Sequence, residues 1–288
     1  MTVRTAFLGF GEAASAFASD PRWTGDAFGY DLKLDDAGAR DAKMRDFGAA
    51  GVDASASCED AISSGDQVLS LVTADQSLAA AKTASGYLNE GTLFFDMNSV
   101  APQRKREAAI FIGAAGGRYV DVAVMSPVYP AQLDVPLLLS GPHAEEGEPA
   151  LKALGFGKVR QVGAEIGRAS VIKMIRSVMV KGIEALTAEC VLAADAAGVV
   201  DEVLESLGAE WPGRANYNLE RMLVHGSRRA AEMEEVCATL ESLGIQPALT
   251  RGTVRRQREL GLLGHHTPPT RLEDKLSLIS GTKEARTA

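Results

Sequence analysis

Features that mark several other protein classes are scarce in this chain of 288 residues. It has only three cysteines, Cys58, Cys190 and Cys237, which lie far apart and form no CxxC pair or cysteine–histidine cluster. A zinc site is therefore not expected, and an odd, sparse cysteine count fits a reducing cytoplasm. No apolar run reaches about 18 residues without a charge, so we expect no membrane-spanning segment. The first predicted strand begins almost at once, which leaves no room for a signal peptide.

Positive charge is in deficit as well. The chain carries 30 lysines and arginines against 38 aspartates and glutamates, a net charge of −8, which argues against a nucleic-acid partner. The run Arg104-Lys105-Arg106 is a local exception that a solvated helix face explains. Hydrophobic residues make up 46% of the chain, enough at this length for one large or two medium domains.

The first informative motif follows a predicted strand over residues 3–8. Gly9, Gly11 and Ala14 match the GxGxxA pattern of dinucleotide-binding turns. Gly9 permits a tight turn, Gly11 lets the backbone approach a pyrophosphate, and Ala14 lets the helix pack close to the strand. A helix that begins near Glu12 would present free N–H groups to the phosphates. The alternative is a plain glycine turn. The residues expected to bind the cofactor here are Gly9, Phe10, Gly11, Glu12 and Ala13.

An acidic residue follows the second predicted strand, residues 27–30. Asp31 lies 22 residues after Gly9, close to the spacing of about 20 at which an acid binds the ribose hydroxyls of the cofactor. A carboxylate there repels a 2′-phosphate, so the sequence predicts NAD as the cofactor. NADP is the alternative because Lys33 and Arg40 lie nearby. A solvated acid at a strand end is a second interpretation of Asp31.

Strands and helices alternate up to about residue 162, and only helical patterns follow. This predicts an α/β Rossmann-type doubly wound sheet followed by an all-α C-terminal domain. We place the dinucleotide-binding domain at residues 1–162 and an all-helical domain at 163–288. Breaks between the helices are expected at Gly198, Pro212-Gly213, Gly244 and Pro247. The expected strands are 3–8, 27–30, 67–72, 92–96, 119–124, 136–140 and 158–162, and the expected helices are 74–84, 101–112, 166–197, 200–207, 217–239 and 253–260.

The long helical pattern over residues 166–197 carries a polar stripe among apolar residues. Lys173, Ser177 and Lys181 are four residues apart, so they share one helix face. Burial would lower the pKa of such a lysine toward the range useful for proton transfer. A surface lysine with an apolar stem is the alternative.

Four segments together resemble the β-hydroxyacid dehydrogenase family, which includes 3-hydroxyisobutyrate and 6-phosphogluconate dehydrogenases. They are residues 9–14, 96–102, 121–126 and 163–177, and the resemblance extends over residues 1–195. It implies that Lys173 is the catalytic acid/base. The chain departs from the family where Ser177 replaces an asparagine and where Met125-Ser126-Pro127 replaces a serine and two glycines. The resemblance further implies that Asn98, Ser99, Met125 and Ser126 lie near the substrate, that Asn98 also lies near the nicotinamide, and that Val72 and Thr73, ending the fourth strand, line the nicotinamide-ribose side.

The C-terminal part resembles a less-characterised branch of that family through residues 221–233. The chain lacks the large helical domain of 6-phosphogluconate dehydrogenase, so that substrate is not expected. The resemblance implies a homodimer with intertwined helical domains, in which His225 would contact the substrate of the partner. For Arg228-Arg229 a solvated helix face is favoured over a substrate carboxylate site.

Together these features predict a cytoplasmic NAD(P)-dependent oxidoreductase. It would transfer a hydride between nicotinamide and a small β-hydroxy acid or related hydroxy compound, with Lys173 as general acid/base and Ser177 beside it. An imine reductase is one alternative, disfavoured because the lysine position commonly changes in those relatives. A non-catalytic nicotinamide-binding sensor is another, which the departures at Ser177 and Met125-Ser126-Pro127 keep open.

Overall fold

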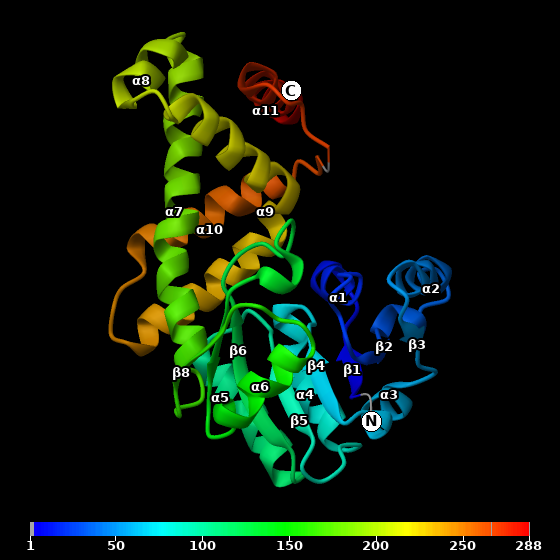
Figure 1. The fold of residues 1–288 in the computed structure, drawn as a ribbon. Coiled ribbons are helices and arrows are strands. Elements are labelled where there is room, and N and C mark those ends of the chain that lie inside the picture. Colours follow the sequence, from blue (N-terminus) through cyan, green and yellow to red (C-terminus); the bar gives the residue numbers. More distant parts are fainter. Residues whose placement is uncertain (1–2, 266, 288) are drawn as a thin grey trace. The chain divides into compact units, whose positions relative to one another are not determined.

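The computed structural model describes residues 3–265 and 267–287, with side chains up to residue 281. The chain divides into two compact units, Met1–Lys173 and Met174–Ala288, and each is described by itself. Figure 1 shows the elements of both units along the chain. The predicted functional domains, residues 1–162 and 163–288, remain a prediction.

The first unit is built on one eight-stranded sheet with the order β3-β2-β1-β4-β5-β6-β7-β8. Every neighbouring pair is parallel except β6 and β7, which are antiparallel. The doubly wound sheet predicted from the sequence is therefore confirmed. The two-residue strand β3 was not predicted, because so short a strand carries no alternation of apolar and polar residues. The strands are β1 Arg4–Leu8, β2 Asp26–Tyr30, β3 Asp53–Ala54, β4 Gln67–Ser70, β5 Leu93–Asp96, β6 Arg118–Val124, β7 Leu137–Ser140 and β8 Val159–Gly163.

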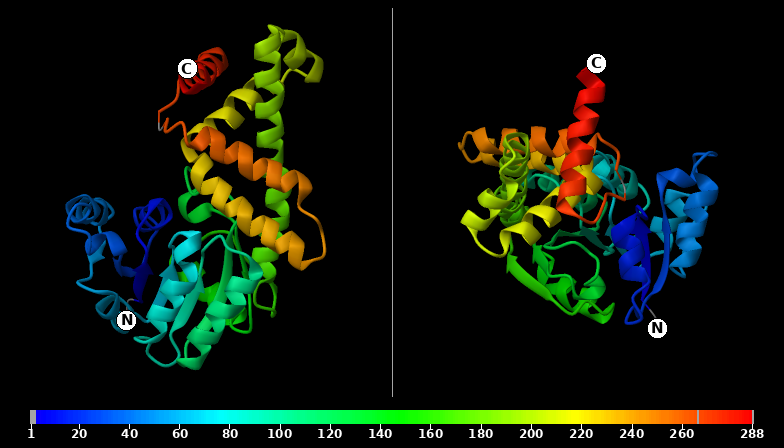
Figure 2. Two further views of the ribbon diagram at one scale, coloured as in Figure 1. Left: turned by 180° about the vertical axis from the view of Figure 1, so that it is seen from behind. Right: turned by 90° about the horizontal axis from the view of Figure 1, so that it is seen from above.

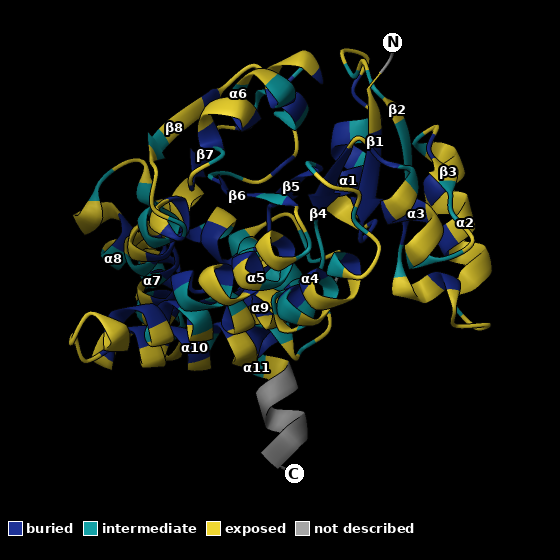
Figure 3. Cartoon of the chain, turned by 90° about the horizontal axis from the view of Figure 1, so that it is seen from below, coloured by how far each residue is buried: buried dark blue, intermediate teal, exposed yellow. Residues whose placement is uncertain are grey.

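Helices cover both faces of this sheet. From β1 the strands proceed to β3 in one direction and from β4 to β6 in the other, so right-handed crossovers place the connecting helices on opposite faces. Figure 3 shows the buried strands between α6 on one side and α4 and α5 on the other. The sequence patterns did not indicate α2, α3 or α6. The helices are α1 Glu12–Ala18, α2 Arg40–Ala49, α3 Cys58–Ser64, α4 Ser77–Ser85, α5 Pro102–Ala114 and α6 Ala144–Ala153, with short 3₁₀ helices at Leu32–Leu34, Ala74–Gln76 and Gln132–Asp134.

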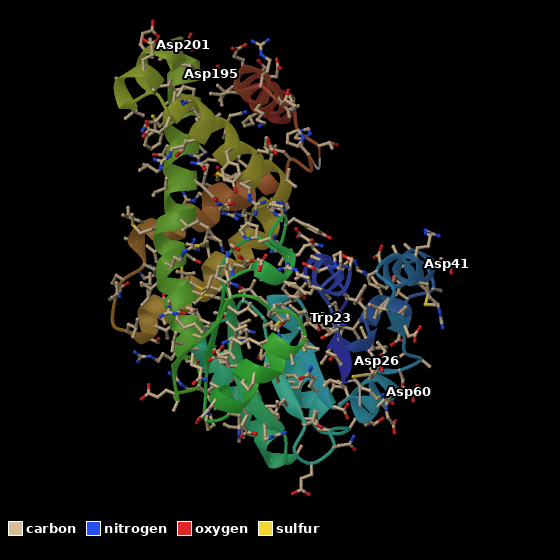
Figure 4. All side chains as sticks on the ribbon, viewed as in Figure 1. Trp23, Asp26, Asp41, Asp60, Asp195 and Asp201 are labelled. Atoms are coloured by element: carbon tan, nitrogen blue, oxygen red, sulfur yellow. The ribbon has the colours of Figure 1, made fainter. Side chains whose placement is uncertain are left out.

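The ring of Trp23 packs against Phe7 of strand β1, two residues before the glycine turn. The ring of Trp23, which is marked in Figure 4, lies 5.4 Å from the ring of Phe7. Its indole Nε1 donates a hydrogen bond of 2.7 Å to the carbonyl of Gly25, so the polar end of the ring is satisfied. Phe7 is fully buried in the core of the first unit. The strand that leads into the dinucleotide motif is therefore held on its apolar side.

The second unit is helical, as predicted: its described residues contain no strand. Helix α7 begins in the first unit and continues through the second. Helix α9 begins at Trp211, so the predicted break at Pro212-Gly213 is wrong. Proline is tolerated there because the first turn of a helix has no partner for its N–H groups. No helix of the described residues is long and apolar enough to cross a membrane. The helices are α7 Arg168–Ala197, α8 Val200–Leu207, α9 Trp211–Ser242, α10 Ala248–Gly261 and α11 Leu272–Thr287.

Helices α9 and α10 cross at a pair of glycines, and the crossing is visible in Figure 2. A Cβ added to Gly226 would lie 2.7 Å from the backbone nitrogen of Gly261 and closer still to the carbonyl oxygen of Gln257. Backbone atoms cannot give way as a flexible side chain can. The two helices therefore pack this closely only because both residues lack a side chain.

We predict that Gly226→Ala destabilises the helical unit by about 1–3 kcal/mol, because the methyl group would overpack the crossing. Gly252→Ala is the matched control, since a Cβ at Gly252 on α10 meets nothing within 4 Å. That change should be neutral or stabilising by about 0.5–1 kcal/mol, the usual gain of alanine over glycine in a helix. Urea unfolding followed by circular dichroism measures both. Equal stability of the two variants would contradict the proposed close crossing.

Candidate functional site at the carboxyl edge of the sheet

One row of residues in register crosses the sheet near its carboxyl edge. Strands β1 and β4 lie side by side but continue in opposite directions through the sheet order. Ligands of doubly wound sheets bind outside the carboxyl ends of the strands at such a switch point. Gly9 and Asp31 follow this row directly in the chain, and Val72 and Asn98 follow it by two residues. The row consists of Tyr30, Leu8, Ser70, Asp96, Asp121 and Ser140.

The glycine turn after β1 has the features of a phosphate-binding turn. Gly9 has a φ of 86°, and a Cβ there would lie 2.8 Å from both the carbonyl oxygen of Leu71 and Cγ1 of Val72. Glycine is thus required by conformation and by space. A Cβ on Gly11 would meet nothing within 4 Å, so packing inside the chain does not require glycine there. Gly11 precedes α1 with no side-chain cap, which leaves the helix N-terminus open to an anion.

The loop between these glycines is held in place by three contacts of Phe10. Its backbone N–H donates to Oδ2 of Asp31 at 2.8 Å. Its carbonyl oxygen accepts from Nζ of the buried Lys43 at 2.7 Å. Its ring stacks on Phe47 of α2 with 4.0 Å between ring centroids. The turn is therefore organised before any ligand arrives. Glu12 and Ala13 follow as the first two residues of α1.

Asp31 has structural bonds that the sequence did not indicate. Besides the bond from Phe10, its Oδ1 accepts from the backbone N–H of Lys33 at 3.0 Å and so caps the first 3₁₀ helix. The side chain is half-buried and holds two backbone N–H groups, so it has a structural role besides the predicted one. Each carboxylate oxygen retains a second lone pair. The residue is therefore able to accept ribose hydroxyls while it holds the turn.

Val72 and Thr73 lie beyond β4, not at its end as predicted, because the strand stops at Ser70. Leu71 donates its N–H to the carbonyl of Leu8, the residue before the glycine turn. This bond holds the segment after β4 beside that turn. The side chain of Val72 borders the position of Gly9, whereas Thr73 is exposed at the start of the second 3₁₀ helix. Val72 thus lies against the dinucleotide turn.

Asn98 is oriented by bonds that leave one of its atoms unpaired. Its Nδ2 donates to Oδ1 of Asp96 at 2.8 Å and to Oγ of Ser70 at 3.0 Å, and its backbone N–H donates to the same Asp96 oxygen. Its Oδ1 and the Oγ of Ser99 are buried without a hydrogen-bond partner. Buried polar groups without partners are costly, so this pair is suited to a polar ligand.

Two further unpaired polar atoms occur near the starts of α4 and α5. They are Oγ of Ser77 and Oε1 of Gln103, both buried without a partner. Neither residue was predicted from the sequence. Both residues lie in the first turn of a helix that follows a parallel strand, and this position was the signal that could have indicated them. Unpaired atoms here, together with the open Gly11, fit a dinucleotide and its substrate at this edge.

A lysine taken from the sequence as solvated is instead at the centre of this edge. Lys105 is fully buried on α5, and its Nζ lies 2.8 Å from Oδ1 of Asp96 and 3.4 Å from Oδ1 of Asp121. Tyr119 donates its hydroxyl to the other oxygen of Asp96 at 2.7 Å. Burial raises the pKa of Tyr119 well above its ordinary value, and the two carboxylates add to the effect. The pattern Arg104-Lys105-Arg106 hides the fact that one of the three faces the sheet.

Lys173 follows the first turn of α7, and this turn is bonded to the sheet. Ser170, three residues earlier, makes two hydrogen bonds to Asp121 of β6. Lys173 itself is half-buried and is the last residue of the first unit. Ser177 lies one turn further along the same helix. Their roles as acid/base and substrate contact stay predictions.

The segment after β6 contains Met125 and Ser126, which the resemblance places near the substrate. The backbone N–H of Met125 donates to the carbonyl of Pro136 at 2.9 Å and is not available to a ligand. Ser126 Oγ makes one local bond of 3.2 Å, to the carbonyl of Pro127. The Ser126 hydroxyl is therefore more available to a ligand than the N–H of Met125.

The second unit contains His225 and a buried ionic cluster. His225 is half-buried on α9. The interpretation of Arg228-Arg229 as solvated holds for Arg228 and is wrong for Arg229, which is buried and paired with Glu184. Lys181, the third polar residue of the α7 stripe, is paired with Glu232, and burial lowers its pKa. No group of three or more potential metal ligands is found among the residues that the structure describes.

Comparisons with known families agree with this geometry. Residues 29–163 match the NAD binding domain of 6-phosphogluconate dehydrogenase, and residues 194–260 match a domain of unknown function, DUF1932. The first unit therefore carries an NAD(P)-binding domain. The first match begins after the glycine turn, so the turn itself rests on the geometry described above.

Solved structures extend the likeness over the whole chain. A conserved hypothetical protein from Sinorhizobium meliloti 1021 is 33% identical with a TM-score of 0.72, covering 98% of this chain and 97% of that one. Conserved protein MTH1747, described as structurally similar to 3-hydroxyacid dehydrogenases, is 31% identical with a TM-score of 0.68, covering 90% of this chain and 96% of that one.

A more distant structure shares the fold alone. The 3-hydroxyisobutyrate dehydrogenase of Mycobacterium tuberculosis, solved with L-serine, has a TM-score of 0.73 at 16% identity and covers 98% of this chain and 100% of that one. With the two domain matches and the two closer relatives, these findings establish that the chain belongs to the β-hydroxyacid dehydrogenase family, as a member with a C-terminal helical domain.

Proposed function

We propose that the protein is an NAD(P)-dependent dehydrogenase that transfers a hydride between nicotinamide and a small β-hydroxy acid, with Lys173 as the general acid/base. The observation that carries the proposal is the attachment of α7. Its first turn is bonded to Asp121 in the same register row that precedes Gly9 and Asn98. The lysine thus belongs to the same compact unit as the dinucleotide turn.

The residues divide the work in a simple way. The open N-terminus of α1 and the backbone at Gly11 bind the pyrophosphate, and Asp31 binds the adenosine ribose. The bound nicotinamide supplies hydride chemistry. Lys173 Nζ takes the hydroxyl proton of the substrate during oxidation and returns it during reduction, which contributes about 10²–10⁴-fold.

The unpaired atoms of the Asn98 loop would hold the substrate. Asn98 Oδ1 accepts a donor of the ligand, and Ser99 Oγ is able to donate or accept. Ser177 would hydrogen-bond the reacting oxygen. Its hydroxyl is shorter than the family amide, so we expect a substrate of different shape, with aryl-substituted 3-hydroxy acids among those tested first. Solved relatives that act on 3-hydroxyisobutyrate support a β-hydroxy acid as the class.

The alternatives differ in what Lys173 does. An imine reductase or a sensor that binds nicotinamide without turnover would share the cofactor site. The retained lysine disfavours the first, and the bonds that fix its helix to the cofactor edge disfavour the second.

Lys173→Ala should abolish turnover and leave cofactor affinity unchanged, because the cofactor turn lies on other elements. Reduced-nicotinamide absorbance, with 3-hydroxyisobutyrate, L-serine and aryl-substituted 3-hydroxy acids as probes, measures turnover. Fluorescence titration measures cofactor binding. Lys152→Ala, on the exposed side of α6, is the matched control. A folded Lys173→Ala variant with normal turnover would remove the proposed mechanism.

The cofactor preference is tested at Asp31. Asp31→Asn keeps a carbonyl oxygen for the N–H of Phe10 but removes the charge that opposes a 2′-phosphate. We expect the ratio of NADP to NAD affinity to rise by roughly tenfold or more, since like charges a few ångströms apart repel by a few kcal/mol at the protein surface. Asp41→Asn, on α2 in Figure 4, is the control of equal charge. An unchanged ratio in calorimetric titrations would show that Asp31 does not face the ribose.

A homodimer through the helical domain is part of the proposal. Helix α7 carries a stripe of exposed apolar side chains at helical spacing, with Met179 65% and Leu186 69% exposed. Solvated stripes of this kind on one helix are unusual unless a partner covers them. The stripe comprises Ile175, Met179, Ile183 and Leu186.

We predict that the double variant Met179→Glu/Leu186→Glu sediments as a monomer while the native chain sediments as a dimer. Burying two new carboxylates in an apolar interface is costly. A matched double change on the exposed side of α10 and its preceding loop, Leu249→Glu/Ile245→Glu, should leave the native state of association unchanged. A native chain that is monomeric at micromolar concentration, and fully active, would refute the dimer.

A further inference from the structure

We propose that Asp121 is a positioning residue, which through Ser170 fixes the turn of α7 that carries Lys173. The proposal rests on the function proposed above, because it concerns how the acid/base lysine is placed. From the sequence, Asp121 was expected only to belong to a segment near the substrate, and no role was predicted for it.

The carboxylate of Asp121 acts as a cap for α7 from a neighbouring strand. Its Oδ1 accepts the hydroxyl of Ser170 at 2.7 Å, and its Oδ2 accepts the backbone N–H of Ser170 at 3.1 Å. Ser140 of β7 donates to the same Oδ2 at 2.9 Å and accepts the N–H of Ala169 at 2.9 Å. Two N–H groups that a helix start leaves without partners are thus satisfied by the sheet.

A negative charge at this place is favourable for two reasons. The N-terminus of a helix carries partial positive charge, which a carboxylate stabilises. Lys105 supplies a full positive charge 3.4 Å from Asp121 Oδ1. Both side chains are fully buried, so water does not screen the interaction. The cap is therefore stronger and less mobile than a cap at the surface.

The same network of hydrogen bonds extends to the Asn98 loop after β5. Lys105 also bonds Oδ1 and the carbonyl of Asp96, at 2.8 and 2.6 Å. Asp96 Oδ1 in turn accepts from Asn98. A continuous chain of buried bonds therefore runs from the Asn98 loop after β5, through Lys105 of α5 and Asp121 of β6, to Ser170.

Lys173 lies one helical turn beyond this anchor. Three residues of helix advance the chain by about 4.5 Å and return it close to the same face. A shift of the first turn is therefore passed on to the lysine with little attenuation. Misplacement by about 1 Å is enough to cost roughly 100-fold in rate, so the anchor bears on turnover as well as on stability.

The test uses two variants of the full chain. Ser170→Ala removes one bond to Asp121 and should lower kcat by roughly 3- to 10-fold, a part of the more than tenfold that one hydrogen bond to a charged group contributes. Asp121→Asn changes the cap without changing its shape and should lower kcat by about 10- to 100-fold. Ser170→Ala should leave KM for NAD unchanged, because Ser170 is at the end of the network away from Asn98 and the glycine turn is not part of the network. Amide hydrogen exchange of residues 165–175 should become faster in both.

Thr5→Val is the matched control for lost stability. Thr5 Oγ1 accepts a buried bond of 3.0 Å from Gln67 in the same unit, at the opposite end of the strands. This variant loses a comparable buried bond, so its unfolding midpoint should fall as in Ser170→Ala. Its kcat and the hydrogen exchange of residues 165–175 should stay native.

The outcomes separate this proposal from the proposed function. If Lys173→Ala abolishes turnover while folded Ser170→Ala and Asp121→Asn keep native kcat, the positioning role is refuted and the mechanism stands. Native exchange of residues 165–175 in Ser170→Ala would also refute it, whether or not a substrate is known. An equal fall of kcat in Thr5→Val would show that lost stability alone lowers kcat in Ser170→Ala, which would also refute the positioning role. If Lys173→Ala keeps turnover, the proposed function itself fails.

Discussion

The site depends on one buried ionic arrangement, Lys105 between Asp96 and Asp121. Removing three charged groups from water is expensive, and such clusters persist only when further hydrogen bonds satisfy the remaining lone pairs. Here Tyr119, Asn98, Ser140 and Ser170 supply those bonds. The cluster therefore joins three strands and two helices, because its members on β5, β6, β7, α5 and α7 are bonded to one another.

The two ends of the carboxyl edge are fixed by different physics. At β1 the constraint is steric: Gly9 is confined by Leu71 and Val72, and Phe10 is clamped by stacking and backbone bonds. At β6 the constraint is electrostatic and lies entirely below the surface. Open or unpaired positions remain at Gly11 after β1 and at Asn98 and Ser99 after β5. Because the carboxyl edge is already ordered, a ligand that binds there loses little free energy to ordering the protein.

Periodicity, glycine spacing and strand–helix alternation were enough to predict the doubly wound sheet and the helical C-terminal unit. What the sequence could not give was the partner of each charged residue. Lys105 and Arg229 sit in runs of basic residues that resemble solvated faces, yet both are buried because their helices turn those positions toward carboxylates. Strand β3 and the start of α9 were missed for lack of local signal: one is too short to alternate, and the other contains proline where proline is harmless.

The bonds of Asp31 join two properties that are usually treated as separate. The oxygen that holds the Phe10 N–H belongs to the same carboxylate that we propose binds the ribose. A lineage of such proteins that changed this acid to a small or basic residue, to accept a phosphorylated ribose, would also release the loop beside it. Cofactor exchange by a single substitution is therefore constrained, and a viable route needs a second residue that takes over the backbone bond before or together with the loss of the acid.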